Sequence, residues 1–176
     1  MTDAPTRLAG LARPMQHAMN NFFMVLQANL EAVQATLPPE ERNAVRVGRA
    51  LQGAREMEAL IRAYLRLGRP HEEGQVDSGK FLDAVRPVLA LAVGKPLKVE
   101  VLATATIAPP RPEVDLALLD LTAGARGLPP GQPPLLRLDG SAIEVNWPAP
   151  EGALEALAEL GLQASSQDGA TRIVLG

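Results

Sequence analysis

His17 is the residue in this sequence whose side chain best fits covalent chemistry near neutral pH. An imidazole can act there as a nucleophile, a general acid or a general base. The chain of 176 residues contains no cysteine and one other histidine, His71. These counts exclude a disulfide framework, a thiolate zinc site and a cysteine nucleophile, and they argue against a metal site built from imidazoles. We therefore predict that the chain itself holds no metal.

The helix that holds His17 is expected to expose it. The helix is predicted to begin at Asp3 or at Pro14. From Met15 on, apolar residues recur every three or four positions and form one stripe, roughly 80° wide at about 100° per residue. The stripe consists of Met15, Met19, Phe22, Leu26, Leu30, Val33 and Leu37. His17 falls on the side opposite this stripe, together with Arg13, Asn20, Asn21 and Met24. A histidine that is merely solvated on a polar face is the alternative.

A second helix is predicted from about 39 to 67, with Glu40 and Glu41 in its first turn and with Gly68 and Pro70 ending it. Two helices of this length joined by a tight turn form an antiparallel hairpin. One apolar seam is too thin a core for such a hairpin to stand alone. Two hairpins would complete a four-helix bundle, so we predict a homodimer.

The rest of the chain alternates between short strands and helices. We predict strands at 75–76, 97–102, 135–138, 142–147, 162–165 and 171–175, and helices at 77–93, 113–126 and 151–160. This alternation predicts an α+β fold: a helical hairpin followed by a small α/β sandwich, with a mixed sheet and helices on one face. The domains are residues 1–69 and 70–176, joined by a linker at about 69–74.

The net charge of −3 conceals a split between the two halves. Residues 1–70 contain nine arginines and six acidic residues, whereas residues 71–176 contain 8 basic and 14 acidic residues. The acidic total and the lack of aromatic residues within a basic patch argue against nucleic-acid binding. No segment approaches the ~20 apolar residues that span a bilayer, so we expect a cytoplasmic protein without a membrane partner.

The first helix resembles the phosphoacceptor helix of two-component histidine kinases. Residues 17–23 read HAMNNFF and residues 25–31 read VLQANLE, where many hybrid kinases have His, acid, apolar, Asn, Asn and two apolar residues, then an apolar stretch ending in Gly-Asn-Leu-Glu. Residues 48–66 resemble the partner helix of the same dimerisation and phosphotransfer domain. The resemblance implies that His17 accepts the phosphoryl group and that Asn21 positions it or a water, with Asn20 as a further site residue.

The second domain resembles a reduced form of the ATP-binding domain of the same family. Residues 118–126, LLDLTAGAR, align with the helix that carries the family's Asn-rich box. Asp120 replaces the first Asn, and Gly124 replaces the Asn that would hold Mg²⁺, although glycine has no side-chain oxygen for a hard cation. Residues 146–150 replace the adenine-reading box, and no glycine-rich lid follows. The resemblance therefore implies a domain without nucleotide and a chain without a cofactor.

Ala18 stands where the kinases place an acid directly after the histidine. The absence of this acid and of the nucleotide-binding boxes argues against ATP-dependent autophosphorylation. The whole pattern resembles the dimeric histidine phosphotransferases of alphaproteobacterial phosphorelays. It implies phosphohistidine transfer between the aspartates of response-regulator receiver domains, with a hybrid histidine kinase upstream and Mg²⁺ supplied by the receiver. The residues expected to contact the acidic receiver are Arg13, Met24, Arg42, Arg46 and Arg49.

Two other interpretations remain at this point. A pseudokinase-like regulator would bind a receiver or a kinase and inhibit or dephosphorylate it without carrying phosphate itself. A dimeric scaffold would leave His17 idle, and the arginines would then form local ion pairs on a solvated helix face. Acid-labile, base-stable phosphate on the protein separates the relay from both.

Overall fold

The computed structural model describes residues 4–69 and 74–176. The chain divides into two compact units, Met1–Arg69 and Pro70–Gly176. The first is a pair of long antiparallel helices, and the second is a mixed sheet with helices, so the predicted fold class is confirmed. None of the helices in the described part of the chain is long and apolar enough to cross a membrane.

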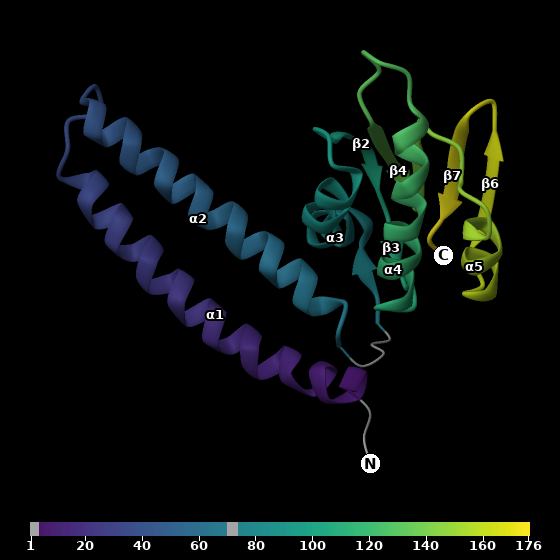
Figure 1. Ribbon diagram of the computed structural model, residues 1–176, viewed down its shortest axis with the longest axis horizontal. Helices are drawn as coiled ribbons and strands as arrows, with labels where there is room; N and C mark the ends of the chain where they lie inside the picture. Colours follow the sequence, from purple (N-terminus) through teal and green to yellow (C-terminus); the bar gives the residue numbers. More distant parts are fainter. Residues whose placement is uncertain (1–3, 70–73) are drawn as a thin grey trace. The chain divides into compact units, whose positions relative to one another are not determined.

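The hairpin consists of α1 (Ala4–Ala35) and α2 (Arg42–Arg66), which lie side by side along their length (Figure 1). The first helix continues through Pro14 and does not restart there. The second begins at Arg42, later than predicted, so Glu40 and Glu41 precede its first turn. A proline disfavours helical backbone in the residue before it, and the chain around Pro38 forms a turn closed by the Glu41 amide, which donates to the Pro38 carbonyl at 3.0 Å.

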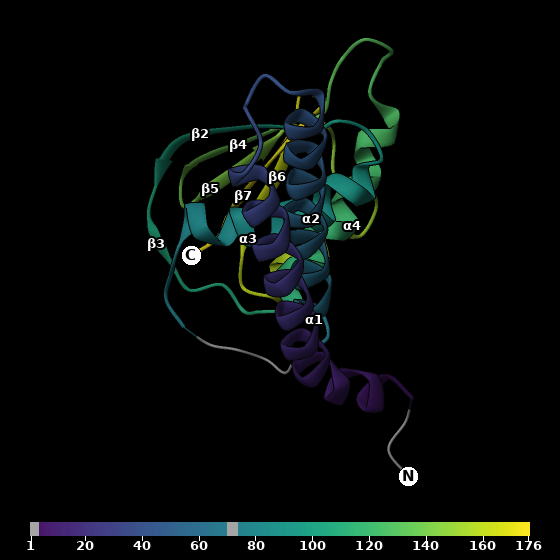
Figure 2. The same cartoon turned by 90° about the vertical axis from the view of Figure 1, so that its left-hand side faces the viewer.

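The second unit is built on a five-stranded sheet in the order β2-β4-β5-β7-β6 (Figure 2). The first pair is parallel and the other pairs are antiparallel. The strands are β2 (Lys98–Thr104), β4 (Leu135–Gly140), β5 (Ala142–Val145), β6 (Gln163–Gln167) and β7 (Ala170–Val174). A further small sheet pairs β1 (Val76–Asp77) with β3 (Thr106–Ile107), a strand that the sequence pattern did not predict.

The helices of this unit are α3 (Ser78–Val93), α4 (Glu113–Leu121) and α5 (Ala153–Glu159). The predicted helix over 113–126 changes after Leu121 into the 3-10 helix η1 (Thr122–Gly127). The Thr122 hydroxyl donates to the Leu119 carbonyl at 2.6 Å, which occupies a carbonyl that a continued helix would use.

The sheet has an apolar face and a charged face. Leu136, Leu138, Ile143, Val145 and Ile173 are buried between the sheet and the helices. On the opposite face a row of alternating charge crosses four strands in register: Glu100, Arg137, Glu144 and Arg172. Arg137 lies 3.2 Å from Glu100 and 3.5 Å from Glu144. This alternation lets one face remain in water while the other forms the core.

Candidate functional site

His17 is exposed on α1, as its position on the predicted helix requires. The residues of α1 that pack against α2 centre on Ala12 and Phe23, which are buried. His17 is turned about 120° around the helix from this packing face, at about 100° per residue. No residue of the described chain forms a hydrogen bond or ion pair with His17. The imidazole is thus available to a molecule that approaches from outside the hairpin.

The apolar stripe predicted for α1 is divided between two faces. Met19 and Leu30 are half-buried toward α2, whereas the residues turned about 90° away, in the sense opposite to His17, are exposed. These exposed residues are Leu11, Met15, Phe22, Leu26 and Val33. In α2, Met57 and Tyr64 are also exposed, and they are turned in the same sense from the α2 packing face. In two antiparallel helices, side chains turned by the same angle and in the same sense from the packing faces point to the same side of the hairpin. Both helices therefore contribute to one surface, here called the apolar face.

Three side-chain pairs fix how the two helices are aligned. The Gln27 amide donates to Glu58 at 2.6 Å, and Arg55 donates to Glu31 at 2.7 Å. At the far end of the hairpin, the Arg69 guanidinium donates to the Gln16 side-chain oxygen. His17 therefore lies at the level of the residues that directly follow α2, at the end of the hairpin away from the connection between the helices.

The structure gathers some of the predicted site residues around His17. Arg13 and Asn21 are each one helical turn from it and exposed, and Met24 is exposed two turns on. Asn20 is half-buried toward the α2 side. These four residues and His17 share one continuous stretch of α1.

Arg42, Arg46 and Arg49 are not near this stretch. They lie in the first eight residues of α2, beside the connection, roughly 30 to 40 Å along the hairpin axis from the level of His17 at about 1.5 Å per residue. They are also turned to the sides of α2 that face away from the His17 side.

Sequence reasoning missed the arginines of the second half of the hairpin that lie nearest to the level of His17, namely Arg66 and Arg69. Arg69 contacts Gln16, the residue before His17. The available signal was the antiparallel hairpin itself, because it places the end of α2 beside the start of α1.

In the second unit, Gly124 lies where the family resemblance places a magnesium-binding Asn. A Cβ atom built on Gly124 would lie 2.1 Å from the Pro148 carbonyl oxygen and 2.8 Å from the Trp147 ring. The chain after β5 therefore occupies the space that any side chain at position 124 would need.

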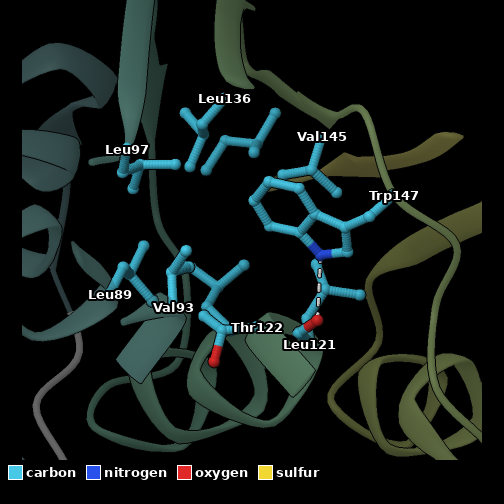
Figure 3. A pocket seen from close by; sticks show the side chains of 10 residues that line it. Leu89, Val93, Leu97, Leu121, Thr122, Leu136, Val145 and Trp147 are labelled. Atoms are coloured by element: carbon cyan, nitrogen blue, oxygen red, sulfur yellow. Dashed lines mark hydrogen bonds between the residues drawn. The ribbon is translucent and has the colours of Figure 1, made fainter. Parts of the chain in front are cut away.

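Trp147 fills the adjacent space between the sheet and the helices (Figure 3). Its side chain is buried, and its indole N–H donates to the Leu121 carbonyl at 2.9 Å. Thr171 holds the same segment through a 2.9 Å hydrogen bond to the Trp147 carbonyl. The cavity left around Trp147 is about 10 Å³, which accommodates no more than one water molecule.

Trp147 and Pro148, which fill the space next to Gly124, are called the plug. A surface groove of about 560 Å³ lies beside the plug, between the α4–η1 segment and α5. Its polar side chains include Asp120, Arg126 and Glu151. Within residues 4–69 and 74–176, no group of three or more His, Cys, Asp or Glu side chains is arranged to hold a metal ion.

Comparison with solved structures finds proteins whose backbone is similar to that of this chain. It is similar to the cytoplasmic segment of histidine kinase QseC, with a TM-score of 0.48 and 13% identity over 72% of this chain and 92% of that one. It is similar to a bacterial phosphotransferase, with a TM-score of 0.36 and 14% identity over 98% of this chain and 97% of that one. A histidine kinase from Burkholderia phymatum STM815 matches with a TM-score of 0.35 and 12% identity, over 98% of this chain and 96% of that one.

No family model and no curated protein matches the chain. Since the three TM-scores are below 0.5, these likenesses do not identify its family. The side chains of the hairpin itself must therefore support any functional interpretation.

Proposed function

We propose that the chain is a histidine phosphotransferase of a phosphorelay, in which His17 carries a phosphoryl group between the aspartates of two receiver domains. The supporting observation is the place of His17 on the hairpin. Its imidazole is exposed on a side of α1 that does not pack against α2 and that does not belong to the apolar face. A carrier of this kind must present one nucleophile to large partners, and a rigid helix side does so.

The proposed transfer needs only an exchange of bonds at phosphorus. The unprotonated ring nitrogen attacks the aspartyl phosphate, an N–P bond forms, and the O–P bond breaks with its electron pair on the departing carboxylate. In the second half, the carboxylate of another receiver attacks phosphorus and the imidazole leaves. Phosphoryl transfer depends mainly on positioning and charge stabilisation, and each receiver brings Mg²⁺. The Asn21 amide, one turn from His17, can donate to a phosphoryl oxygen.

The proposal includes a homodimer assembled through the apolar face. This face contains seven exposed apolar side chains from both helices of the hairpin, on a unit whose buried seam is only one layer thick. A second copy would bury the same face of its partner and complete a four-helix core. His17 is turned to the other side of α1, so this pairing leaves the imidazole accessible.

Incubation with a receiver domain phosphorylated on its aspartate tests the proposal. We expect radioactive phosphate on the full chain that is labile in acid and stable in base. His17→Ala should abolish the label, and His71→Ala should retain it as the matched control for loss of a histidine. Label that persists in His17→Ala would refute the assignment.

A second candidate function is a regulator that inhibits or dephosphorylates a receiver without carrying phosphate. Ala18 favours it, because this residue offers no carboxylate to orient the imidazole, and no described residue hydrogen-bonds to His17. In that case the receiver would lose phosphate to water while the chain stays unlabelled.

A further inference from the structure

Arg13 is exposed on α1 one helical turn before His17, on the same side of the hairpin. Side chains four residues apart on a helix are neighbours, with Cβ atoms about 5 to 6 Å apart. Helical side chains also lean toward the N-terminus of their helix, so the His17 ring extends over the turn that contains Arg13. The helix continues through Pro14, whose missing N–H belongs to the bond with Gly10, so the turn from 13 to 17 is intact.

Four arginines at this end of the hairpin have side chains that the structure describes, and three of them have partners. Arg62 is paired with a glutamate. Arg69 donates to the residue before His17, and Arg66 also has a partner within the protein. Arg13 forms no ion pair or hydrogen bond with any residue of the described chain. Among these four, Arg13 therefore has the guanidinium that is available to a molecule bound at His17.

The described carboxylates of the hairpin are too distant to neutralise Arg13. Residues 4–30 contain no aspartate or glutamate, so the first acidic residue after His17 on α1 is Glu31, about 20 Å along the axis. On α2 the nearest described carboxylate is Glu58, about 15 Å along the axis from His17. A fixed negative charge beside Arg13 is thus lacking among the described residues of the hairpin.

We propose that Arg13 binds the phosphoryl group that His17 carries. This inference rests on the proposed function, and it assigns to Arg13 a contact with the transferred group itself in addition to one with the receiver surface. A phosphoryl group on the imidazole places negatively charged oxygens beside the guanidinium, which forms charge-assisted hydrogen bonds with such oxygens. Asn21 flanks the ring from one turn after His17 and can donate from its amide.

The contact stabilises the phosphorylated chain without changing which bonds are exchanged. The N–P bond forms as the O–P bond of the aspartyl phosphate breaks, and the guanidinium neither gives nor accepts a proton. A residue that only docks the receiver changes the forward and reverse rate constants by the same factor. A residue that binds the phosphoryl group on His17 instead shifts the equilibrium toward phosphohistidine, because it interacts with one of the two states.

A test without a receiver uses the full chain with His71→Ala, so that His17 is the only histidine. Phosphoramidate, a small phosphoryl donor to imidazoles, loads His17, and phosphorus NMR follows the protonation of the phosphoryl group with pH. A nearby cation favours its more highly charged form, so Arg13→Gln should raise the pKa of the phosphoryl group. Arg55→Gln removes the same charge at an exposed position about 20 Å along the hairpin and should leave this pKa unchanged.

Lysine, glutamine and glutamate at position 13 form a graded series. Arg13→Lys retains the charge and should titrate close to the parent chain, whereas Arg13→Glu should raise the pKa of the phosphoryl group further than Arg13→Gln does. Helical circular dichroism should be the same in all variants, because the side chain of Arg13 is exposed. An unchanged titration in both Arg13→Gln and Arg13→Glu would overturn the contact.

A second measurement uses a phosphorylated receiver domain as the donor. Arg13→Gln should lower the equilibrium ratio of phosphorylated chain to phosphorylated receiver by about threefold to tenfold, and Arg55→Gln by less than about twofold. Equal decreases of the forward and reverse rate constants at an unchanged ratio would make Arg13 a docking residue only and would also overturn the proposal. If the proposed function fails instead, the wild-type chain takes no phosphate from the receiver, although phosphoramidate still loads His17.

Discussion

Gly124 shows at the scale of one residue how packing in the second unit excludes a side chain at the position that the family resemblance assigns to Asn. The family resemblance implies an Asn that binds magnesium at this position, but the sequence does not reveal what surrounds the glycine that stands there. In the structure the Pro148 carbonyl and the Trp147 ring occupy the place of a Cβ atom at position 124. A larger side chain at this one position therefore meets backbone, which cannot move aside as the end of a flexible side chain can.

We predict that Gly124→Asn destabilises the protein by about 2 to 4 kcal/mol, because the Pro148 backbone and the buried Trp147 ring must shift to admit the side chain. Chemical denaturation followed by tryptophan fluorescence measures the change, since Trp147 is the single tryptophan. Gly127→Asn is the matched control in the same 3-10 helix, where a Cβ meets nothing within 4 Å. Equal stability of the two variants would show that the segment after β5 moves freely.

Trp147 leads to a prediction about nucleotide. With a residual cavity of about 10 Å³ around its ring, the space between sheet and helices has no room for a purine. Isothermal calorimetry with ATP and Mg²⁺ should give no binding heat up to millimolar nucleotide. A micromolar dissociation constant would contradict this and would support a kinase.

At the scale of one element, α3 depends on Asp77 at its N-cap. The carboxylate accepts from the Lys80 backbone N–H at 3.0 Å. This bond, with a further one from the Thr104 hydroxyl, holds the pKa of Asp77 below its usual value of 3.8. Because the folded state lowers this pKa, the carboxylate stabilises α3 at neutral pH, and that contribution is lost as the pH falls through the folded-state pKa.

We expect the Asp77→Asn variant to lose less stability than the wild type when the pH falls below about 4, since an amide caps a helix without titrating. Urea denaturation at several pH values measures the difference. Asp83→Asn on the same helix is the control for removal of one exposed carboxylate. Parallel pH profiles for the wild type and Asp77→Asn would exclude the cap as the titrating contribution.

The hairpin shows, also at the scale of elements, which structural features the hydrophobic periodicity of the sequence predicts and which it does not. The 3.6-residue pattern of α1 predicts the helix and the exposure of His17, and the structure confirms both. The single stripe is divided, however, because each helix of a two-layer hairpin turns only part of its apolar surface toward its neighbour. Phe23 is buried and Phe22 is exposed, a difference that depends on where α2 lies.

At the scale of the whole molecule, the arrangement of the hairpin's faces decides what can bind where. The apolar face and His17 are turned in opposite senses from the seam between α1 and α2. A second copy and an acidic receiver would therefore approach from different sides. We infer that dimerisation and phosphoryl transfer do not compete for one surface.

We predict that Phe22→Glu disrupts the proposed homodimer, because it places a charge within the apolar face. Met24→Glu is the matched control: Met24 is 65% exposed and Phe22 66%, but Met24 is on the His17 side. Sedimentation equilibrium measures the association state. If Met24→Glu dissociates the dimer and Phe22→Glu does not, the interface lies on the His17 side and the proposed assembly is wrong.

The sequence alone determined the features that depend on local periodicity and on residue type. Helical spacing predicted both long helices and placed His17 opposite the apolar stripe, and strand alternation with turn residues predicted the α+β unit. Element boundaries shifted where side chains compete with the backbone. One example is β5, which ends at Val145 because the Asn146 side chain accepts the Leu135 amide at 2.8 Å.

Only the tertiary structure decided which residues meet. Arg42, Arg46 and Arg49, which the sequence predicts as receiver contacts, lie at the opposite end of α2 from His17, because a helix separates residues by about 1.5 Å each and the antiparallel turn brings the last residues of the hairpin to the level of His17. The plug of Trp147 and Pro148 over Gly124 likewise joins segments more than twenty residues apart. Sequence patterns report which face of an element a side chain occupies, whereas its neighbours depend on how the elements pack.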